Sequence, residues 1–401
     1  MPHRPDTYAS GEASRRLTGL DSLRGLAALS VLAYHVGLTS GLTRFGPLAP
    51  VLAQLKAGVA IFFVISGCVL WLPYARALRG GGELPDARRF TERRARRIVP
   101  AYWLALSALA LLPWGGVLGP EAWRYYALGQ IYHSDTLMGG LGVAWSLCVE
   151  VSFYAAVPIL ALILRGVVRR RGGRVPAPAQ LALLAVIALG SLVWRLALAG
   201  GVVADMPHRG FVVMTALPGC ADWFALGMAI AVLVAAWPPD GRIPAVGEVL
   251  LARRWPAWSA AGALMLAAVV TEPHDLFLGL YNPAAHLEVG LAGALIVARA
   301  ALAPLVTRTQ TSAAGPVDAV GRWLGEVSYG IYLWHIIVLE VLLGGPPGAP
   351  ARAHSPLHAL VLLTATTAGA VACAAASWYG LERPLLRAGA RRRAIVAPTA
   401  A

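Results

Sequence analysis

Residues 20–35 read LDSLRGLAALSVLAYH and place an arginine and a histidine inside an otherwise apolar stretch. The surrounding apolar run, 19–38, has the length of a membrane-spanning helix. At about 100° per residue, the step from Arg24 to His35 makes three turns plus roughly 20°. We therefore expect both side chains on one helix face, about 16 Å apart along the axis. Since burying an arginine in a membrane costs about 2.5–3.5 kcal/mol, a functional role is the first hypothesis. The alternatives are a snorkelling Arg24 and a packing role for His35.

The composition places this chain of 401 residues among polytopic membrane proteins. It is 58% hydrophobic and 13% charged, with a mean hydropathy of +0.63, values outside the range of soluble domains. Lys56 is the only lysine, so the net charge of +14 comes almost wholly from arginine. Because the arginines gather in alternate loops, we interpret them as a topology signal and expect no nucleic-acid partner. The four cysteines show no metal-ligand spacing, and we expect no metal.

Ten apolar runs predict an all-α fold, that of a polytopic membrane protein with about ten transmembrane helices. We find no internal repeat and no separable soluble domain in the sequence. The runs cover residues 19–38, 57–75, 98–114, 143–164, 179–199, 214–236, 257–271, 287–305, 326–344 and 357–378.

The arginine and lysine counts in the loops predict that both termini are cytoplasmic. The tails and alternate loops on that side hold 27 basic residues, whereas the opposite loops hold four, Arg44, Arg124, Arg209 and Arg352. Arg24 then lies near the cytoplasmic surface and His35 in the outer half of the bilayer. We expect a cytoplasmic N-terminal tail over 1–16, one membrane domain over 17–390 and a disordered C-terminal tail over 391–401.

An arginine cluster precedes the third apolar run, where residues 93–100 read RRARRIVP. We expect the insert 76–97 to be a loop, and Pro100 is typical of the first turn of a helix. The arginines before it are then expected beside a helix N-terminus, where free amides already favour anions. Guanidinium groups in that place make a phosphate site. A stop-transfer charge run is the alternative.

Two more ionisable side chains lie inside apolar runs. Glu150 occurs in WSLCVEVSFY, residues 145–154, and it requires a polar cavity or a cationic partner, because an unpaired carboxylate in a membrane is costly. His335 ends the motif SYGIYLWH, residues 328–335. A structural ion pair for Glu150 and a packing role for His335 stay open as alternatives.

In these residues the chain resembles the membrane-bound acyltransferase-three family, whose members O-acylate cell-envelope glycans and macrolides. The resemblance covers nearly the whole chain and rests on six motifs in the family's order. They are Leu20-Asp21-x-Leu-Arg24-Gly25 with His35, FFVISG at 62–67, R-x-x-R-I-x-P at 94–100, WSLxxExxFY at 145–154, SYxxYLWH at 328–335 and ERP at 382–384.

This resemblance implies an integral-membrane O-acyltransferase that moves an acyl group, with acetyl favoured, from cytoplasmic acyl-CoA to a hydroxyl group. His35 would act as the general base toward the acceptor hydroxyl, and Glu150 would orient His35 or neutralise Arg24. Direct transfer and a transient acyl-histidine both remain open. The candidate residues are Arg24, His35 and Glu150 for catalysis, Arg24, Ser66, Arg94 and Arg97 for acyl-CoA, and Asp21, Trp145, Tyr154, Tyr332 and His335 in support.

The acceptor is expected to be a hydroxylated carbohydrate or glycoside. An envelope glycan or glycolipid is favoured, because His35 lies nearer the outer face of the bilayer; a macrolide or other secondary metabolite is the alternative. We expect a multi-pass protein of the inner (plasma) membrane. A transporter or flippase of a glycosidic substrate is the rival class. The helix face that carries Arg24 and His35 would then be its proton or ligand path.

Overall fold

The computed structural model describes residues 18–168, 174–199, 212–237, 253–272, 282–306, 315–346 and 354–388. These residues form helices joined by turns, with no β-strand among them, which confirms the all-α fold. The tails predicted at 1–16 and 391–401 lie outside the described residues.

Ten long helices in the described part of the chain coincide with the ten apolar runs. They are α2 (Thr18–Thr39), α4 (Gly58–Gly80), α5 (Ala87–Ala110), α7 (Trp145–Val168), α8 (Ala177–Ala199), α11 (Leu217–Ala235), α13 (Arg254–Thr271), α14 (Pro283–Val306), α15 (Pro316–Leu343) and α16 (Pro356–Ser377). A π-helical turn, Trp378–Glu382, continues α16. Shorter helices occupy the connections at α3 (Ala49–Ala53), Gln54–Ala57, α6 (Ala122–Tyr126), Gln130–Tyr132 and Gly142–Ala144.

Seven of the helical segments in the described residues are long and apolar enough to cross a membrane. The three long helices outside this set are α2, α5 and α13. Asp21 and Arg24 lie in the first half of α2, and the arginine cluster lies in the first half of α5. The apolar part of α13, Trp255–Thr271, is shorter than the others. The fold of a membrane protein is therefore confirmed, while ten spans and cytoplasmic termini stay predictions.

The insert expected as a loop at 76–97 is mostly helical, so that prediction was wrong. α4 continues to Gly80, and α5 already begins at Ala87, where the Asp86 carboxylate caps it by accepting a hydrogen bond from the Arg89 amide at 2.7 Å. Pro100 consequently lies inside α5 and not in its first turn. Asp86, an acidic residue typical of an N-cap, sets the start of α5, and Pro100 does not mark a helix start.

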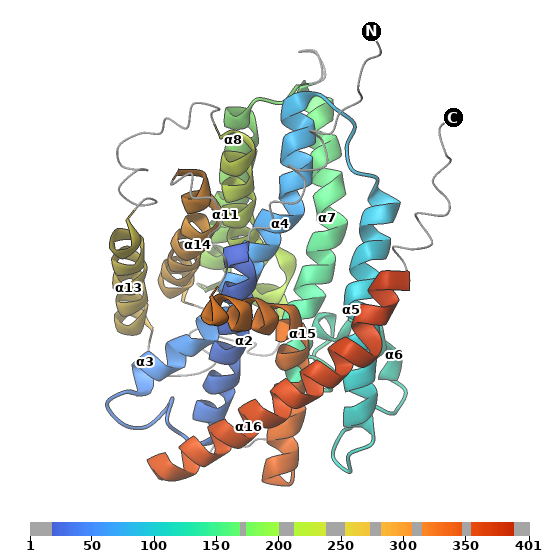
Figure 1. Ribbon diagram of the computed structural model, residues 1–401, viewed down its shortest axis with the longest axis vertical. Helices are drawn as coiled ribbons and strands as arrows, with labels where there is room; N and C mark the ends of the chain where they lie inside the picture. The colour runs from blue at the N-terminus through green and yellow to red at the C-terminus, as the bar shows by residue number, and fades with distance from the viewer. Residues whose placement is uncertain are drawn as a thin grey trace.

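Glycines allow α2 and α4 to approach their neighbours closely (Figure 1). A Cβ atom at Gly325 of α15 would collide with the Asp21 carbonyl oxygen of α2. A Cβ atom at Gly67 of α4 would likewise collide with the Phe224 carbonyl oxygen of α11. Small residues at helix crossings are a common packing device in membranes, because they let the backbones meet. A Cβ atom at Gly58 of α4 would collide with the Ala27 carbonyl oxygen of α2. The crossings at Gly58 and Gly325 hold α2, the helix of Arg24 and His35, between α4 and α15.

The outer helices cover this centre from different directions. In Figure 1, α4 and α7 run along the long dimension of the molecule, and α16 crosses obliquely in front of α2 and α15. α13 lies at the outside and packs on α14. The result is a helical assembly in which α2 contributes lining residues to both cavities of the candidate site.

Candidate active site

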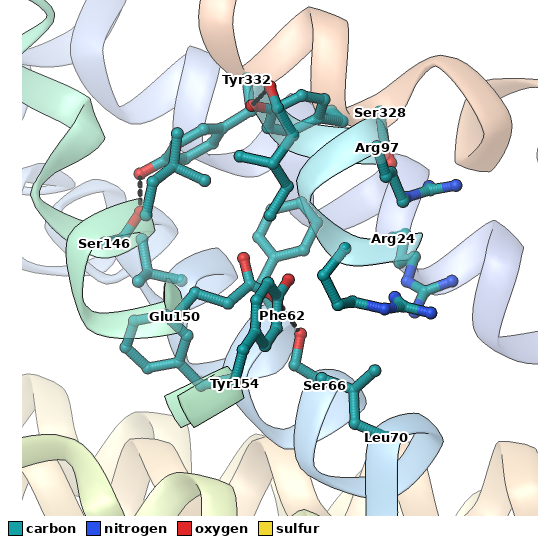
Figure 2. Close-up of a pocket in the computed structure, with 16 residues that line it drawn as sticks. Arg24, Phe62, Ser66, Leu70, Arg97, Ser146, Glu150, Tyr154, Ser328 and Tyr332 are labelled. Carbon is teal, nitrogen blue, oxygen red and sulfur yellow. Dashed lines mark hydrogen bonds between the residues drawn. The ribbon is translucent and has the colours of Figure 1, made fainter. Parts of the chain in front are cut away.

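An arginine pocket lies between α2, α4, α5, α7 and α15 (Figure 2). Its empty volume is about 720 Å³, including the open mouth. Three guanidinium groups line it, those of Arg24, Arg94 and Arg97, and Glu150 is the one carboxylate among its described lining residues. The pocket is therefore strongly positive. The other lining residues are Val59, Phe62, Phe63, Ser66, Leu70, Ile98, Ser146, Leu147, Tyr154, Ser328, Tyr329 and Tyr332.

Arg94 and Arg97 reach the pocket from one face of α5. They are three residues apart, a spacing that places side chains on the same helix surface. Arg93 and Arg96, which alternate with them, are exposed and do not line the pocket. Because α5 begins at Ala87, neither Arg94 nor Arg97 lies beside the N-terminus of α5, so the free amides expected there do not lie beside these two arginines. The positive charge comes from the guanidinium groups.

Arg24 and Glu150 are each held by a neighbour. Arg24 Nη1 lies 3.3 Å from Asp21 Oδ1, one turn earlier on α2, and its side chain is 22% exposed, so a ligand can still reach it. Glu150 Oε1 accepts a 2.5 Å hydrogen bond from Ser66 Oγ, which Figure 2 shows as a dashed line. The carboxylate also lies near enough to Arg24 and Arg94 to attract both electrostatically.

Two tyrosines of α15 form part of the wall of the arginine pocket. The Tyr332 hydroxyl lies 2.8 Å from both Ser146 Oγ and the Val143 carbonyl oxygen (Figure 2). The Tyr329 hydroxyl donates to the Ile98 carbonyl oxygen at 2.9 Å. These contacts tie α15 to α5 and to the start of α7. Ser146 and Tyr329 were quoted in the sequence motifs without a role.

His35 lies next to His335. His35 Nδ1 is 2.9 Å from the Val31 carbonyl oxygen and 3.3 Å from His335 Nε2, and His335 Nδ1 is 3.2 Å from the Ile331 carbonyl oxygen. A carbonyl oxygen only accepts hydrogen bonds, so this geometry assigns the proton to Nδ1 of both rings. His335 Nε2 then accepts from His35. Among the described residues His35 Nε2 has no partner, and it keeps its lone pair for a ligand.

A second space, the histidine cavity, contains His35. Its empty volume is about 1560 Å³. It shares Val59 and Tyr332 with the arginine pocket, so the two spaces are adjacent. The other lining residues are Val31, Tyr34, Leu38, Lys56, Ala57, Met138, Gly140, Gly142, Val143, Trp145, Trp223, Glu272, Ala285, His286, Val289, Ile336, Glu340 and Pro346.

The structure thus separates the predicted residues into two groups. Arg24, Ser66, Arg94, Arg97, Glu150, Tyr154 and Tyr332 line the arginine pocket, and Asp21 contacts Arg24. His35, Trp145 and Tyr332 line the histidine cavity, with His335 behind His35. Glu150 contacts Ser66, whereas the imidazole beside His35 is that of His335. Of the two roles considered for Glu150, the geometry favours charge balance at Arg24 over orientation of His35.

The sequence reasoning missed the polar residues of the histidine cavity. Lys56 forms an ion pair with Glu272, and Glu340 Oε2 accepts a 3.1 Å hydrogen bond from Trp114 Nε1. His286 Nε2 lies 2.9 Å from Asp222 Oδ2. The signal that could have identified them is the same one that identified Glu150, a carboxylate or histidine inside or beside an apolar run.

Sequence comparison decides the family. The family profile described as an acyltransferase domain matches residues 17–375. The chain belongs to the acyltransferase-three family. Membership confirms the resemblance, and with it that the protein is an O-acyltransferase with several membrane-length apolar helices.

Curated relatives of this acyltransferase include an exopolysaccharide production protein, a nodulation protein and a peptidoglycan O-acetyltransferase. The exopolysaccharide production protein ExoZ of Rhizobium meliloti is 30% identical over 84% of this chain and 91% of that protein. Nodulation protein 10 of Rhizobium leguminosarum is 28% identical over 82% of each chain. The peptidoglycan O-acetyltransferase OatA of Listeria monocytogenes is 25% identical over 80% of this chain and 49% of that protein. No solved structure matches the chain.

Proposed function

We propose that this acyltransferase moves an acyl group, with acetyl favoured, from acyl-CoA to a hydroxyl of an envelope glycan or glycolipid. The observation that carries the proposal is the adjacency of the arginine pocket and the histidine cavity, which share Tyr332. One space suits a polyanion, and the other contains an imidazole with a free nitrogen. A reaction between an anionic donor and a neutral hydroxyl needs these two environments side by side.

The donor fits the arginine pocket by charge. Acyl-CoA carries several phosphate groups, and guanidinium groups bind phosphate through paired, charge-assisted hydrogen bonds. Arg24, Arg94 and Arg97 are assigned to this contact, with Asp21 orienting Arg24 and the Ser66–Glu150 pair balancing the local charge. The loop charges favour entry of the donor from the cytoplasmic side of the inner membrane.

The base in this proposal is His35. Its Nε2 accepts the proton of the acceptor hydroxyl while the hydroxyl oxygen attacks the thioester carbonyl carbon. The carbon–sulfur bond then breaks, and the proton on His35 passes to the departing CoA sulfur, so that the products are an ester and free CoA. His335 acts as a positioning residue, because its Nε2 shares the His35 Nδ1–H with the Val31 carbonyl oxygen; together these two acceptors keep His35 Nε2 unprotonated before the reaction.

Release of CoA tests this function. Purified protein is given acetyl-CoA with and without a crude envelope glycan fraction, and free thiol is measured. The proposal expects thiol release that depends on the glycan, and expects Arg24→Lys to lose it, because lysine cannot replace a bidentate guanidinium contact. Glycoside transport into sealed vesicles without CoA release would instead identify a transporter.

A further inference from the structure

We propose that the histidine cavity is the acceptor subsite and that it selects an uncharged sugar over one that carries a carboxylate or phosphate. This inference rests on the proposed function for the role of His35. It adds the chemical class of the acceptor and names the residues that select it, chiefly Glu340.

The cavity is large and lies on the far side of His35 from Arg24. Its empty volume of about 1560 Å³ is roughly twice that of the arginine pocket. Leu38, near the C-terminal end of α2, lines it together with Lys56 and Pro346, which lie in connections between helices. A ligand there approaches His35 from the end of α2 opposite to Arg24.

The charge of the cavity is the reverse of that of the arginine pocket. Among the described lining residues, the ionisable side chains other than histidine and tyrosine are Lys56, Glu272 and Glu340. Lys56 forms an ion pair with one oxygen of Glu272, and Gln54 Nε2 donates to the other at 3.1 Å. This carboxylate is neutralised by Lys56, and each of its oxygens has a hydrogen-bond partner. One lysine against two glutamates leaves a net negative charge, carried by Glu340.

Glu340 has a carboxylate oxygen available for a ligand. The residue is 8% exposed, and in the described structure its side chain has one hydrogen bond, from Trp114 Nε1 to Oε2 at 3.1 Å. Oε1 is left to accept from another donor within the cavity. Leaving an oxygen of a buried carboxylate without a hydrogen bond costs free energy, and a ligand that donates a hydrogen bond to it removes this cost. Sugar hydroxyls donate such bonds, whereas a second anion would be repelled at short range in a low dielectric.

Aromatic side chains line the histidine cavity, and contacts with neighbouring residues hold Trp223 in place. Trp223 stacks on His286 with ring centroids 4.0 Å apart and 13° between the planes, and its Nε1 donates to the His286 carbonyl oxygen at 3.1 Å. His286 is in turn held by Asp222. Tyr34 and Trp145 line the same cavity. Aromatic surfaces with a few convergent polar groups suit a sugar ring, which presents C–H faces and hydroxyl edges.

Equilibrium binding tests the inference directly. The purified protein is titrated with two probes while tryptophan fluorescence is followed. One probe is a neutral β-1,4-linked glucose tetrasaccharide, and the other is the tetrasaccharide of the same linkage built from glucuronic acid. We expect the neutral probe to bind at least tenfold more tightly. Glu340→Gln is expected to weaken binding of the neutral probe and to reduce the preference for it roughly tenfold, which is the scale of one charge-assisted hydrogen bond. The matched control, Glu326→Gln, changes an exposed glutamate of the same helix and is expected to bind like wild type.

Three results would overturn the inference. The two probes could bind equally well, the neutral probe could fail to bind, or Glu340→Gln could leave the preference for the neutral probe unchanged. Glycan-dependent CoA release, measured on the same preparations, separates this result from the proposed function. Failure of the proposed function would appear as loss of glycan-dependent CoA release, whereas failure of the inference leaves that release intact and removes only the preference for the neutral sugar.

Discussion

The imidazoles of His35 and His335 lie 3.3 Å apart, Nδ1 to Nε2, although 300 positions separate the two residues in the chain. Each ring also contacts the carbonyl oxygen four residues before it on its own helix. Two helices, α2 and α15, therefore fix one tautomer of His35 together. The consequence is a half-buried imidazole that lines the histidine cavity and whose Nε2 has no hydrogen-bond partner among the described residues.

The first prediction concerns this pair. Replacing His335 by alanine removes one of the two acceptors around His35 Nδ1–H and leaves the Val31 carbonyl oxygen as the other. The imidazole is then less firmly oriented, so we expect kcat to fall about 10- to 100-fold, the scale seen when a group that orients a reactive imidazole is lost. The KM for acyl-CoA should not change. His335→Gln should recover much of the lost kcat, because its amide oxygen can accept the same hydrogen bond. Steady-state kinetics check this, and an equal loss in both variants would indicate a packing role.

The second prediction concerns the arginine pocket. The double variant Arg94→Gln with Arg97→Gln is expected to raise the KM for acyl-CoA more than it lowers kcat, because both guanidinium groups are assigned to donor binding. Arg93→Gln with Arg96→Gln is the matched control, with the same spacing on the same helix but outside the pocket. If the two double variants have the same donor KM as wild type, the cluster is only a stop-transfer signal.

The third prediction concerns helix packing. Gly67→Ala introduces a methyl group against the Phe224 carbonyl oxygen, so we expect a loss of stability of about 1–3 kcal/mol, typical of overpacking. Gly190→Ala of α8 is the control, since a methyl group there meets open space. Thermal unfolding of the two variants in detergent measures the difference. A Gly67→Ala variant as stable as the control would contradict the close crossing of α4 and α11.

The fourth prediction concerns sidedness. In sealed vesicles of known orientation, with acyl-CoA on the cytoplasmic side, we expect product when a membrane-impermeant glycan lies on the opposite side. The charge distribution of the loops and the position of His35 beyond Arg24 both favour this two-sided arrangement. Product formed only when the acceptor shares the compartment of the donor would favour a cytoplasmic metabolite, such as a macrolide, as the acceptor.

Periodicity and hydropathy were sufficient to predict the helices, because each membrane-length helix satisfies its own backbone and leaves a long apolar run in the sequence. The predicted helix boundaries were wrong where a helix contains many charged residues and so lacks an apolar run. The run 76–97 is polar, yet most of it is helical, since α5 begins at its Asp86 cap and carries its arginines on exposed and pocket-facing surfaces.

The sequence also indicated most of the candidate site residues, but not how they pair. Arg24 and His35 share a helix face, which spacing alone predicts, whereas the contact of His35 with His335 depends on the crossing of α2 and α15 through Gly325. Glu340 was missed because it lies at the end of an apolar run, where a charged residue is ordinarily an interfacial one. Only the fold brings it into the cavity of His35.

The claim that His35 is the base of acyl transfer is tested by the turnover of His35→Ala, with donor binding measured in parallel. We expect at least a hundredfold loss of glycan-dependent CoA release, within the usual 10²–10⁴-fold contribution of such a group, and unchanged binding of acetyl-CoA at the arginine pocket. A His35→Ala protein that keeps more than about a tenth of wild-type turnover would contradict the claim.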